Sequence, residues 1–164
     1  MQKRTAFKLC LAGATAVALN AAPVAVFAKD EPLKVAFVYV SPANEEGWSS
    51  QHDIARKFVE EKFGDKIKVT WIENIPENAD AQRVIRDLAQ QGNKIIFATS
   101  FGYMNSVMKV AKQFPNVYFE HATGYKTSKN VKNYTARFYE GRYLAGMLAA
   151  ATTKTNILGY VAAL

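Results

Sequence analysis

Short apolar runs alternate along the chain with longer segments whose apolar residues recur every three or four positions. The first pattern is typical of buried strands, and the second of helices with one apolar face. The strand pattern occupies residues 34–40, 67–72, 95–98, 117–120 and 131–138, and returns near Ile157. The helical pattern occupies residues 48–63, 79–91, 103–114 and 139–151. This alternation predicts an α/β fold with a doubly wound, mostly parallel sheet that carries helices on both faces.

The loops that follow the strands are the expected place for a ligand. In open α/β sheets ligands bind outside the carboxyl ends of the strands, which selects residues 41–48, 73–78, 99–103 and 120–125. Aromatic and polar side chains in these loops suit a mostly apolar pocket with a few orienting groups. The candidate ligand-binding residues are Glu45, Gly47, Trp48, Ser100, Phe101, Tyr103 and His121, with Trp48 and Phe101 as aromatic walls and Glu45, Ser100 and His121 as polar contacts.

Trp48 can act in two ways at this position. Its ring can stack on a flat ligand while its indole N–H donates a hydrogen bond, or it can pack the helix onto the sheet. His52 follows one helical turn later on the same face. We expect His52 to pack against Trp48, the alternative being that it lines the pocket.

The first 28 residues have the pattern of a secretory signal peptide. Three basic residues precede an uncharged, Ala-rich stretch, and small or apolar residues stand before a cleavage site after Ala28. The alternative, a transmembrane anchor, is disfavoured because Asn20 and Pro23 interrupt the apolar stretch. We therefore expect the chain to be secreted into the periplasm.

Charge and cysteine content narrow the class of protein. The formal charge is +7, and removing the three basic residues of the signal peptide from the 21 leaves 18 against 14 acidic residues, a charge of +4. The basic side chains are scattered, so no nucleic-acid-binding tract is expected. Cys10, the single cysteine, lies inside the signal peptide and not at a lipoprotein cleavage site. The mature chain is thus expected to have neither thiol chemistry nor disulfides.

Ser100 raises an enzymatic alternative. Residues 98–102 resemble the nucleophile elbow of a serine hydrolase, with Ala98 in the first place. Such an enzyme needs an acid and then a histidine, and Glu120 and His121 follow in that order but are adjacent. Neighbours in a strand point to opposite faces, so this pair is poorly placed to complete a triad. Phosphate- and dinucleotide-binding glycine motifs are missing, and two histidines predict no metal site, so we expect neither an enzyme nor a cofactor.

Seven segments together resemble the basic membrane protein family of ABC-transporter substrate-binding proteins, whose members include purine-nucleoside-binding lipoproteins. The segments are KVAFVYVSP at 34–42, EGW at 46–48, HD at 52–53, ATSFGY at 98–103, YFEHATG at 118–124, YEGRYLAG at 139–146 and NILGYVAA at 156–163. The resemblance implies a type-I periplasmic-binding fold that holds a purine nucleoside or base between two lobes, with Trp48 against the purine. It also implies delivery to the permease subunits of an importer. A ligand sensor of the same fold is the alternative.

The resemblance also divides the chain. It implies that residues 29–154 form the N-terminal ligand-binding lobe and that residues 155–164 cross the hinge and begin a second, truncated lobe. Because a strand pattern runs to the end of the sequence, we expect a fragment of a longer protein. The missing lipoprotein site suggests a soluble periplasmic form, peripheral to the inner membrane. A pocket without its second lobe loses enclosure, so we expect this chain by itself to bind weakly.

Overall fold

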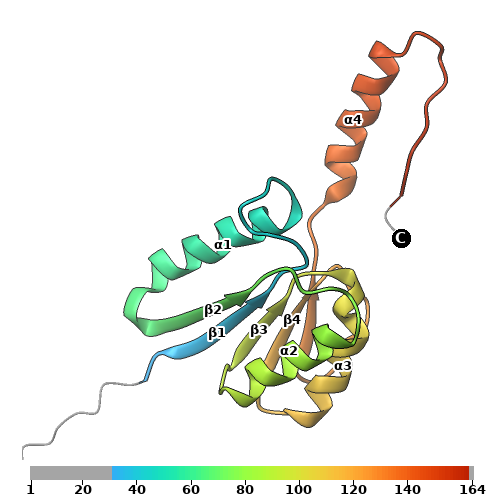
Figure 1. Ribbon diagram of the computed structural model, residues 1–164. Helices are drawn as coiled ribbons and strands as arrows, with labels where there is room; N and C mark the ends of the chain where they lie inside the picture. The colour runs from blue at the N-terminus through green and yellow to red at the C-terminus, as the bar shows by residue number, and fades with distance from the viewer. Residues whose placement is uncertain (1–30, 163–164) are drawn as a thin grey trace, which may run out of the picture. The chain divides into compact units, whose positions relative to one another are not determined.

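Five short strands rich in Val, Ile, Phe and Tyr form one parallel sheet in the computed structural model, which describes residues 31–162 (Figure 1). The strands are β1 (Leu33–Val38), β2 (Ile67–Ile72), β3 (Ile95–Ala98), β4 (Tyr118–Ala122) and β5 (Val131–Tyr134). Their order is β2-β1-β3-β4-β5, and every neighbouring pair is parallel. All five carboxyl ends therefore meet at one edge, and the predicted parallel α/β fold is confirmed.

The helices begin and end close to the predicted residues. They are α1 (Trp48–Phe63), α2 (Ala79–Gln90), α3 (Met104–Gln113) and α4 (Phe138–Thr152), with short 3-10 turns at Gly64–Lys66 and Phe101–Tyr103. Asn78 caps α2, since its side-chain oxygen accepts a hydrogen bond from the Asp80 amide at 2.7 Å. Gly64 ends α1 with φ at 48°, a backbone angle that glycine adopts without strain.

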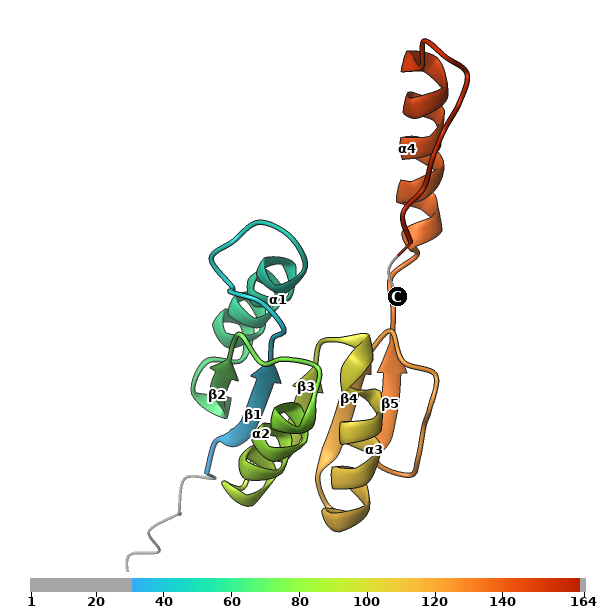
Figure 2. The same cartoon turned by 45° about the vertical axis from the view of Figure 1, so that its right-hand side comes forward.

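Helices α2 and α3 lie side by side over one face of the sheet (Figure 2). Their apolar sides meet the inward side chains of β1, β3 and β4 in a continuous, mostly aliphatic core. Ile85, Leu88, Val107, Val110 and Phe119 are fully buried there. This core fixes the positions of the loops that follow β3 and β4.

Helix α1 covers the opposite face with its polar side inward. Asp53 and Arg56 are buried, whereas Ile54 and Phe58 are 59% and 61% exposed. The Asp53 carboxylate accepts hydrogen bonds from Arg56 at 2.7 Å and from the Tyr39 hydroxyl at 3.4 Å. Burial and the nearby Asp53 charge raise the pKa of Tyr39 above its usual range, so the phenol stays protonated as a donor. The apolar spacing predicted the helix correctly but not the direction of this face.

Two elements near the end of the chain differ from prediction. Strand β5 ends at Tyr134 and not at residue 138, because residues 135–137 leave the sheet and lead into α4. The strand expected from Ile157 is absent: residues 157–162 are extended but pair with no strand among the described residues. A strand needs a neighbour for its backbone hydrogen bonds, and none lies beside this segment.

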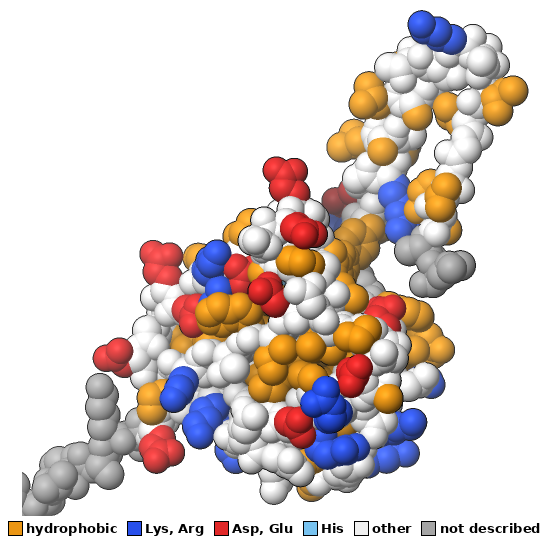
Figure 3. Space-filling model, viewed as in Figure 1, with side chains coloured by type: hydrophobic (Ala, Val, Ile, Leu, Met, Phe, Trp, Pro, Cys, Tyr) orange, Lys and Arg blue, Asp and Glu red, His pale blue; other side chains and the backbone are white. Residues whose placement is uncertain are grey.

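Helix α4 buries none of its side chains, and apolar groups lie along its surface (Figure 3). No helix within residues 31–162 is long and apolar enough to cross a membrane. The predicted signal peptide, residues 1–28, lies outside the described residues and stays a prediction.

Candidate functional site

Two adjoining cavities open at the carboxyl edge of the sheet. One, of about 610 Å³, is the Ser100 cavity, lined by Val40, Trp48, Glu77, Ser100, Phe101, Thr123, Thr135, Phe138 and Arg142. The other, of about 510 Å³, is the His52 cavity, lined by Gly47, Trp48, Gln51, His52, Ala55, Ala122, Thr123, Tyr134, Thr135, Ala136 and Phe138. Four residues belong to both linings, so the cavities are two parts of one site. This is the edge at which the sequence predicted a ligand.

Trp48 lies between the two cavities and is 37% exposed. Its indole N–H donates to the Thr99 carbonyl, which ties the start of α1 to the loop after β3. Its ring centroid lies 4.9 Å from that of His52 and 5.8 Å from that of Phe138. The side chain thus braces the helix, as the second alternative predicted, and its indole N–H is engaged within the protein. Its ring lines both cavities, and stacking on a ligand stays a prediction. The expected contact with His52 is confirmed, and His52 lines a cavity as well.

Ser100 and Phe101 lie together in the Ser100 cavity. Phe101 is 45% exposed, and its ring centroid lies 6.3 Å from that of Tyr125. The Ser100 hydroxyl donates to Oε1 of Glu77, and the Gly102 amide donates to the same oxygen at 2.9 Å. A Cβ atom on Gly102 would lie 2.3 Å from Cδ of Glu77, so the glycine makes room for the carboxylate. Ser100 and Phe101 thus shape one wall of the cavity, while Ser100 and Gly102 hold Glu77.

Three predicted site residues do not line either cavity. His121 is 1% exposed, and its Nε2 donates to the Ser100 carbonyl at 2.7 Å. It therefore positions Ser100 from the core side of the loop. Tyr103 is fully buried and donates to the Ile75 carbonyl; burial and the Glu77 charge raise its pKa above the usual range. Glu45 lies exposed on the surface of its loop. Strand-end position alone could not separate side chains that face the cavity from those that face the core.

The structure adds lining residues that the sequence did not indicate. Glu77 lies in a loop that was selected, yet no motif marked it, because its partners Ser100 and Gly102 come from another loop. The segment after β5 contributes Thr135, Phe138 and Arg142. Extending the fifth strand to residue 138 concealed this loop, whose polar Thr135 was the available signal.

Thr123 joins the site in a backbone conformation that β-branched residues rarely adopt. Its φ is 63°, and it lines both cavities. The Thr123 amide donates to the Tyr134 carbonyl at 2.8 Å, which holds the loop after β4 against the end of β5. Unfavourable backbone angles of this kind persist where the surroundings enforce them, and they cluster at functional sites.

Residues 33–164 match the family model of ABC transporter substrate-binding proteins of the PnrA-like type, Bmp. The chain belongs to this family. A purine-binding protein of Brucella abortus is 55% identical over 132 residues, which are 80% of this chain and 38% of that protein. A candidate ABC transporter glucose-binding protein of Haloferax volcanii, TsgA13, is 41% identical over 133 residues, 81% of this chain and 34% of that protein. The chain thus spans between a third and two fifths of these relatives.

A solved structure of an ABC transporter solute-binding protein from Conexibacter woesei shares the fold, with a TM-score of 0.61 and 22% identity. The match covers 72% of this chain and 40% of that one. The family match confirms the predicted resemblance to the basic membrane protein family, and the neighbouring structure confirms the predicted fold class. Coverage of less than half of that structure is consistent with one lobe of a two-lobed protein.

For a member of this family, the geometry around Ser100 suits binding and gives no support to the hydrolase alternative. The Ser100 hydroxyl donates to Glu77, while Nε2 of His121 is engaged by the Ser100 backbone carbonyl. No histidine therefore contacts this hydroxyl to accept its proton, as a serine nucleophile requires. Within residues 31–162 no group of three or more His, Cys, Asp or Glu side chains is close enough together to hold a metal ion.

Proposed function

We propose that this chain is part of the extracytoplasmic solute-binding component of an ABC importer and that it binds a purine base or nucleoside. The observation that carries the proposal is the Ser100 cavity, where the rings of Trp48 and Phe101 line a concave site at the carboxyl edge of a parallel sheet. Such a site suits a flat heteroaromatic ring, which offers a large apolar surface and a polar rim.

A purine fits the polar groups of the site better than a sugar does. A hexose presents hydroxyl groups on every side and needs many partners. In the cavity the three lining hydroxyls already donate within the protein, and the rest of the lining includes three aromatic rings that suit a flat ligand. The name of the Brucella relative supports a purine, and the name of the Haloferax relative makes glucose the competitor to test.

We further propose that residues 29–154 form the N-terminal lobe and that residues 155–164 lead across the hinge to a second lobe. A signal peptide at 1–28 would deliver the protein to the periplasm, where it would meet the permease subunits at the inner membrane. The chain's coverage of 38% of the Brucella protein supports this division, which leaves the other wall of the cleft to the second lobe.

The indole N–H of Trp48 provides a direct test. The chain has two tryptophans, and Trp71 lies away from the cavities beneath Arg56, so Trp71→Phe leaves one indole resonance in a ¹⁵N NMR spectrum. We expect adenine, adenosine or guanosine to shift this resonance in a saturable way, while glucose does not. The affinity is expected to be weaker than micromolar, since one lobe encloses only part of the ligand.

Trp48→Ala supplies the matched variant. In an otherwise wild-type chain it should weaken purine binding about 5- to 150-fold, because stacking on an aromatic ring is worth about 1 to 3 kcal/mol per base. Binding can be followed through the backbone amides of residues 99–103. Saturable glucose binding without purine binding would overturn the proposed ligand class.

A further inference from the structure

We propose that the Ser100 cavity selects ligands by their hydrogen-bond donors, and that Glu77 is the specificity-determining residue that accepts from them. The inference rests on the proposed function and deepens it. It assigns to the ligand an exocyclic amino group, alone or next to a ring N–H, on the edge that faces the sheet. It begins from a property of the lining: almost every donor there already has an acceptor within the protein.

The hydroxyl and indole donors of the Ser100 cavity all point to internal acceptors, and so does the amide of Gly102 beside it. The indole of Trp48 donates to the Thr99 carbonyl, and both the Ser100 hydroxyl and the Gly102 amide donate to Glu77. The Thr123 hydroxyl donates to the Ala122 carbonyl, and the Thr135 hydroxyl to the Ala136 carbonyl. Arg142, from α4, is the one side-chain donor of the lining with no hydrogen bond to another described residue. At the sheet edge the cavity therefore offers acceptors and few free donors.

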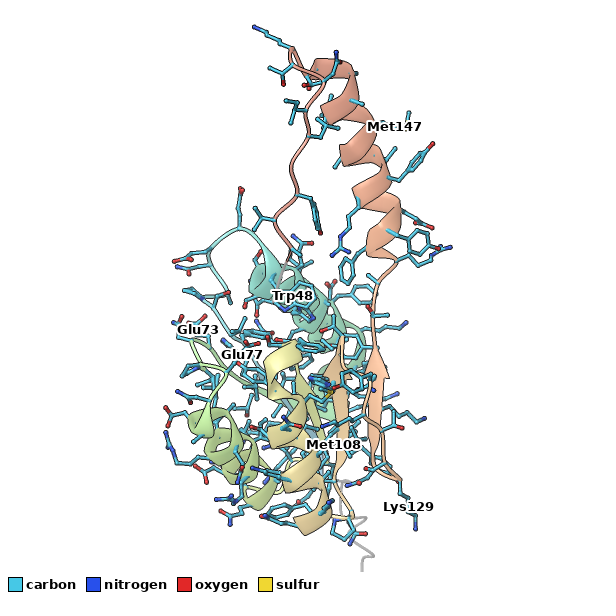
Figure 4. All side chains as sticks on the ribbon, turned by 90° about the vertical axis from the view of Figure 1, so that its right-hand side faces the viewer. Trp48, Glu73, Glu77, Met108, Lys129 and Met147 are labelled. Carbon is cyan, nitrogen blue, oxygen red and sulfur yellow. The ribbon has the colours of Figure 1, made fainter. Side chains whose placement is uncertain are left out.

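Glu77 is the strongest of these acceptors. Its Oε1 takes both the Ser100 hydroxyl and the Gly102 amide, which fixes the carboxylate against the start of the 3-10 turn at Phe101–Tyr103. Its Oε2 accepts no hydrogen bond and forms no ion pair within residues 31–162. A charged acceptor binds an N–H donor more strongly than a neutral one does. Glu77 and Trp48 lie at the same end of the sheet (Figure 4).

Ser100 extends the same pattern. Because the Ser100 hydroxyl proton is directed to Glu77, the lone pairs of the oxygen can accept a hydrogen bond from a second N–H group of the same ligand. Glu77 and Ser100 then form a short row of acceptors beside the aromatic walls. The complementary ligand is a planar heteroaromatic with an exocyclic amine, alone or next to a ring N–H, as adenine and guanine have. Ligands that present hydrogen or a carbonyl oxygen at that place leave Oε2 of Glu77 desolvated and without a hydrogen bond.

The test compares pairs of ligands that differ in one amino group: adenine with purine, and guanine with hypoxanthine. Each is titrated into the full chain carrying Trp71→Phe, and the Trp48 indole resonance gives the dissociation constant. We expect at least one amino compound to bind about 10- to 100-fold more tightly than its partner, the range for a hydrogen bond to a charged group.

Glu77→Gln should remove this preference. The Ser100 hydroxyl and the Gly102 amide both need an oxygen acceptor, so the side-chain oxygen of the glutamine should face them. The side-chain nitrogen of the glutamine then faces the ligand. A donor then meets a donor, and the affinity for the amino compound should fall about 10- to 100-fold while that of its partner stays within about threefold.

Gly102→Ala should have the same effect by another route. The new Cβ would lie 2.3 Å from Cδ of Glu77, so the carboxylate must move. The obstacle is the end of a flexible side chain and the φ of Gly102 is not positive, so the protein should still fold.

Glu73→Gln is the matched control. Glu73 lies in the same loop, accepts from the Ala43 amide at 2.7 Å and lines neither cavity (Figure 4). It should leave the preference unchanged, and thermal unfolding should show that all three variants fold. If adenine and purine, and likewise guanine and hypoxanthine, bind the parent chain equally, the donor inference fails and the purine proposal stands. If none of the four binds, both fail.

Discussion

On the α2–α3 face of the sheet, aliphatic side chains fill the space between helices and strands, whereas on the α1 face a buried ion pair and aromatic rings do so. The first face follows the usual rule that apolar residues at helical spacing point to the core. On the second face, Asp53 and Arg56 point inward and Ile54 and Phe58 point to solvent. The two faces teach that helical periodicity identifies a helix without deciding which of its sides is buried.

The inward polar side of α1 is satisfied by a connected set of contacts. Arg56 donates to Asp53 at 2.7 Å, contacts Glu60, and lies with its guanidinium 3.9 Å from the ring centroid of Trp71 on β2. Lys57 adds a second cation to Asp53 at 2.9 Å. The rings of Phe37 and Phe97 stack on each other on the same face of the sheet, with their centroids 4.5 Å apart. A flat aromatic surface with an arginine above it replaces the aliphatic packing of the other face.

Leu88→Ala should produce the largest effect and would sharpen the contrast. Leu88 is fully buried between α2 and the sheet, and the cavity left by truncation should lower the free energy of unfolding by about 3 to 5 kcal/mol. Ile54→Ala on α1 is the matched change at a 59% exposed position, and its effect should stay below about 0.5 kcal/mol. Urea unfolding measures both. A comparable loss at Ile54 would mean that the exposed side of α1 is covered in solution.

Arg56→Met should produce an intermediate effect. The substitution keeps an apolar stem over Trp71 but leaves the buried Asp53 with Lys57 as its remaining cation. Removing one partner of a buried pair usually costs about 3 to 5 kcal/mol, and because Lys57 stays in place we expect about 2 to 3 kcal/mol in urea unfolding. Lys57→Met, at a 67% exposed side chain, serves as control and should cost less than about 1 kcal/mol. Equal losses from the two variants would contradict a buried role for Arg56.

The smallest expected effect is the dependence of stability on acidic pH that Asp53 of α1 contributes. Desolvation tends to raise the pKa of Asp53, but the hydrogen bonds and charges of Arg56 and Lys57 outweigh it and hold the pKa below its usual range. The unfolded chain then binds the proton more readily. The stabilisation is present above the ordinary aspartate pKa of about 3.9 and is lost as the pH falls through the lower folded value.

Asp53→Asn should therefore flatten the decline of the unfolding free energy as the pH falls below about 5. The comparison is between slopes, since the variant also changes stability at neutral pH. An unchanged slope would show that other carboxylates govern the acid limb of the stability curve.

The sequence alone determined the elements and the place of the site. Apolar runs and helical spacing are set by neighbouring residues, so four of the five strands and all four helices were located within two residues. A parallel sheet then forces its carboxyl ends to one edge, which is why Trp48, Ser100 and Phe101 could be predicted to meet there. The exceptions were the end of the fifth strand, where Thr135 and the residues after it gave no strong turn signal, and the strand expected from Ile157, which is absent from the described residues.

Only the tertiary structure decided which side chains face the cavity. Glu77 and Ser100 are 23 residues apart, and His121 turns inward to bond the Ser100 carbonyl, while Glu45 stays on the surface. The inward turn of Asp53 and Arg56 likewise depends on Tyr39, which follows β1, and on Trp71 of β2. The physical reason is common to all of these: a polar side chain takes its direction from partners brought close by folding, and local sequence spacing carries no record of them.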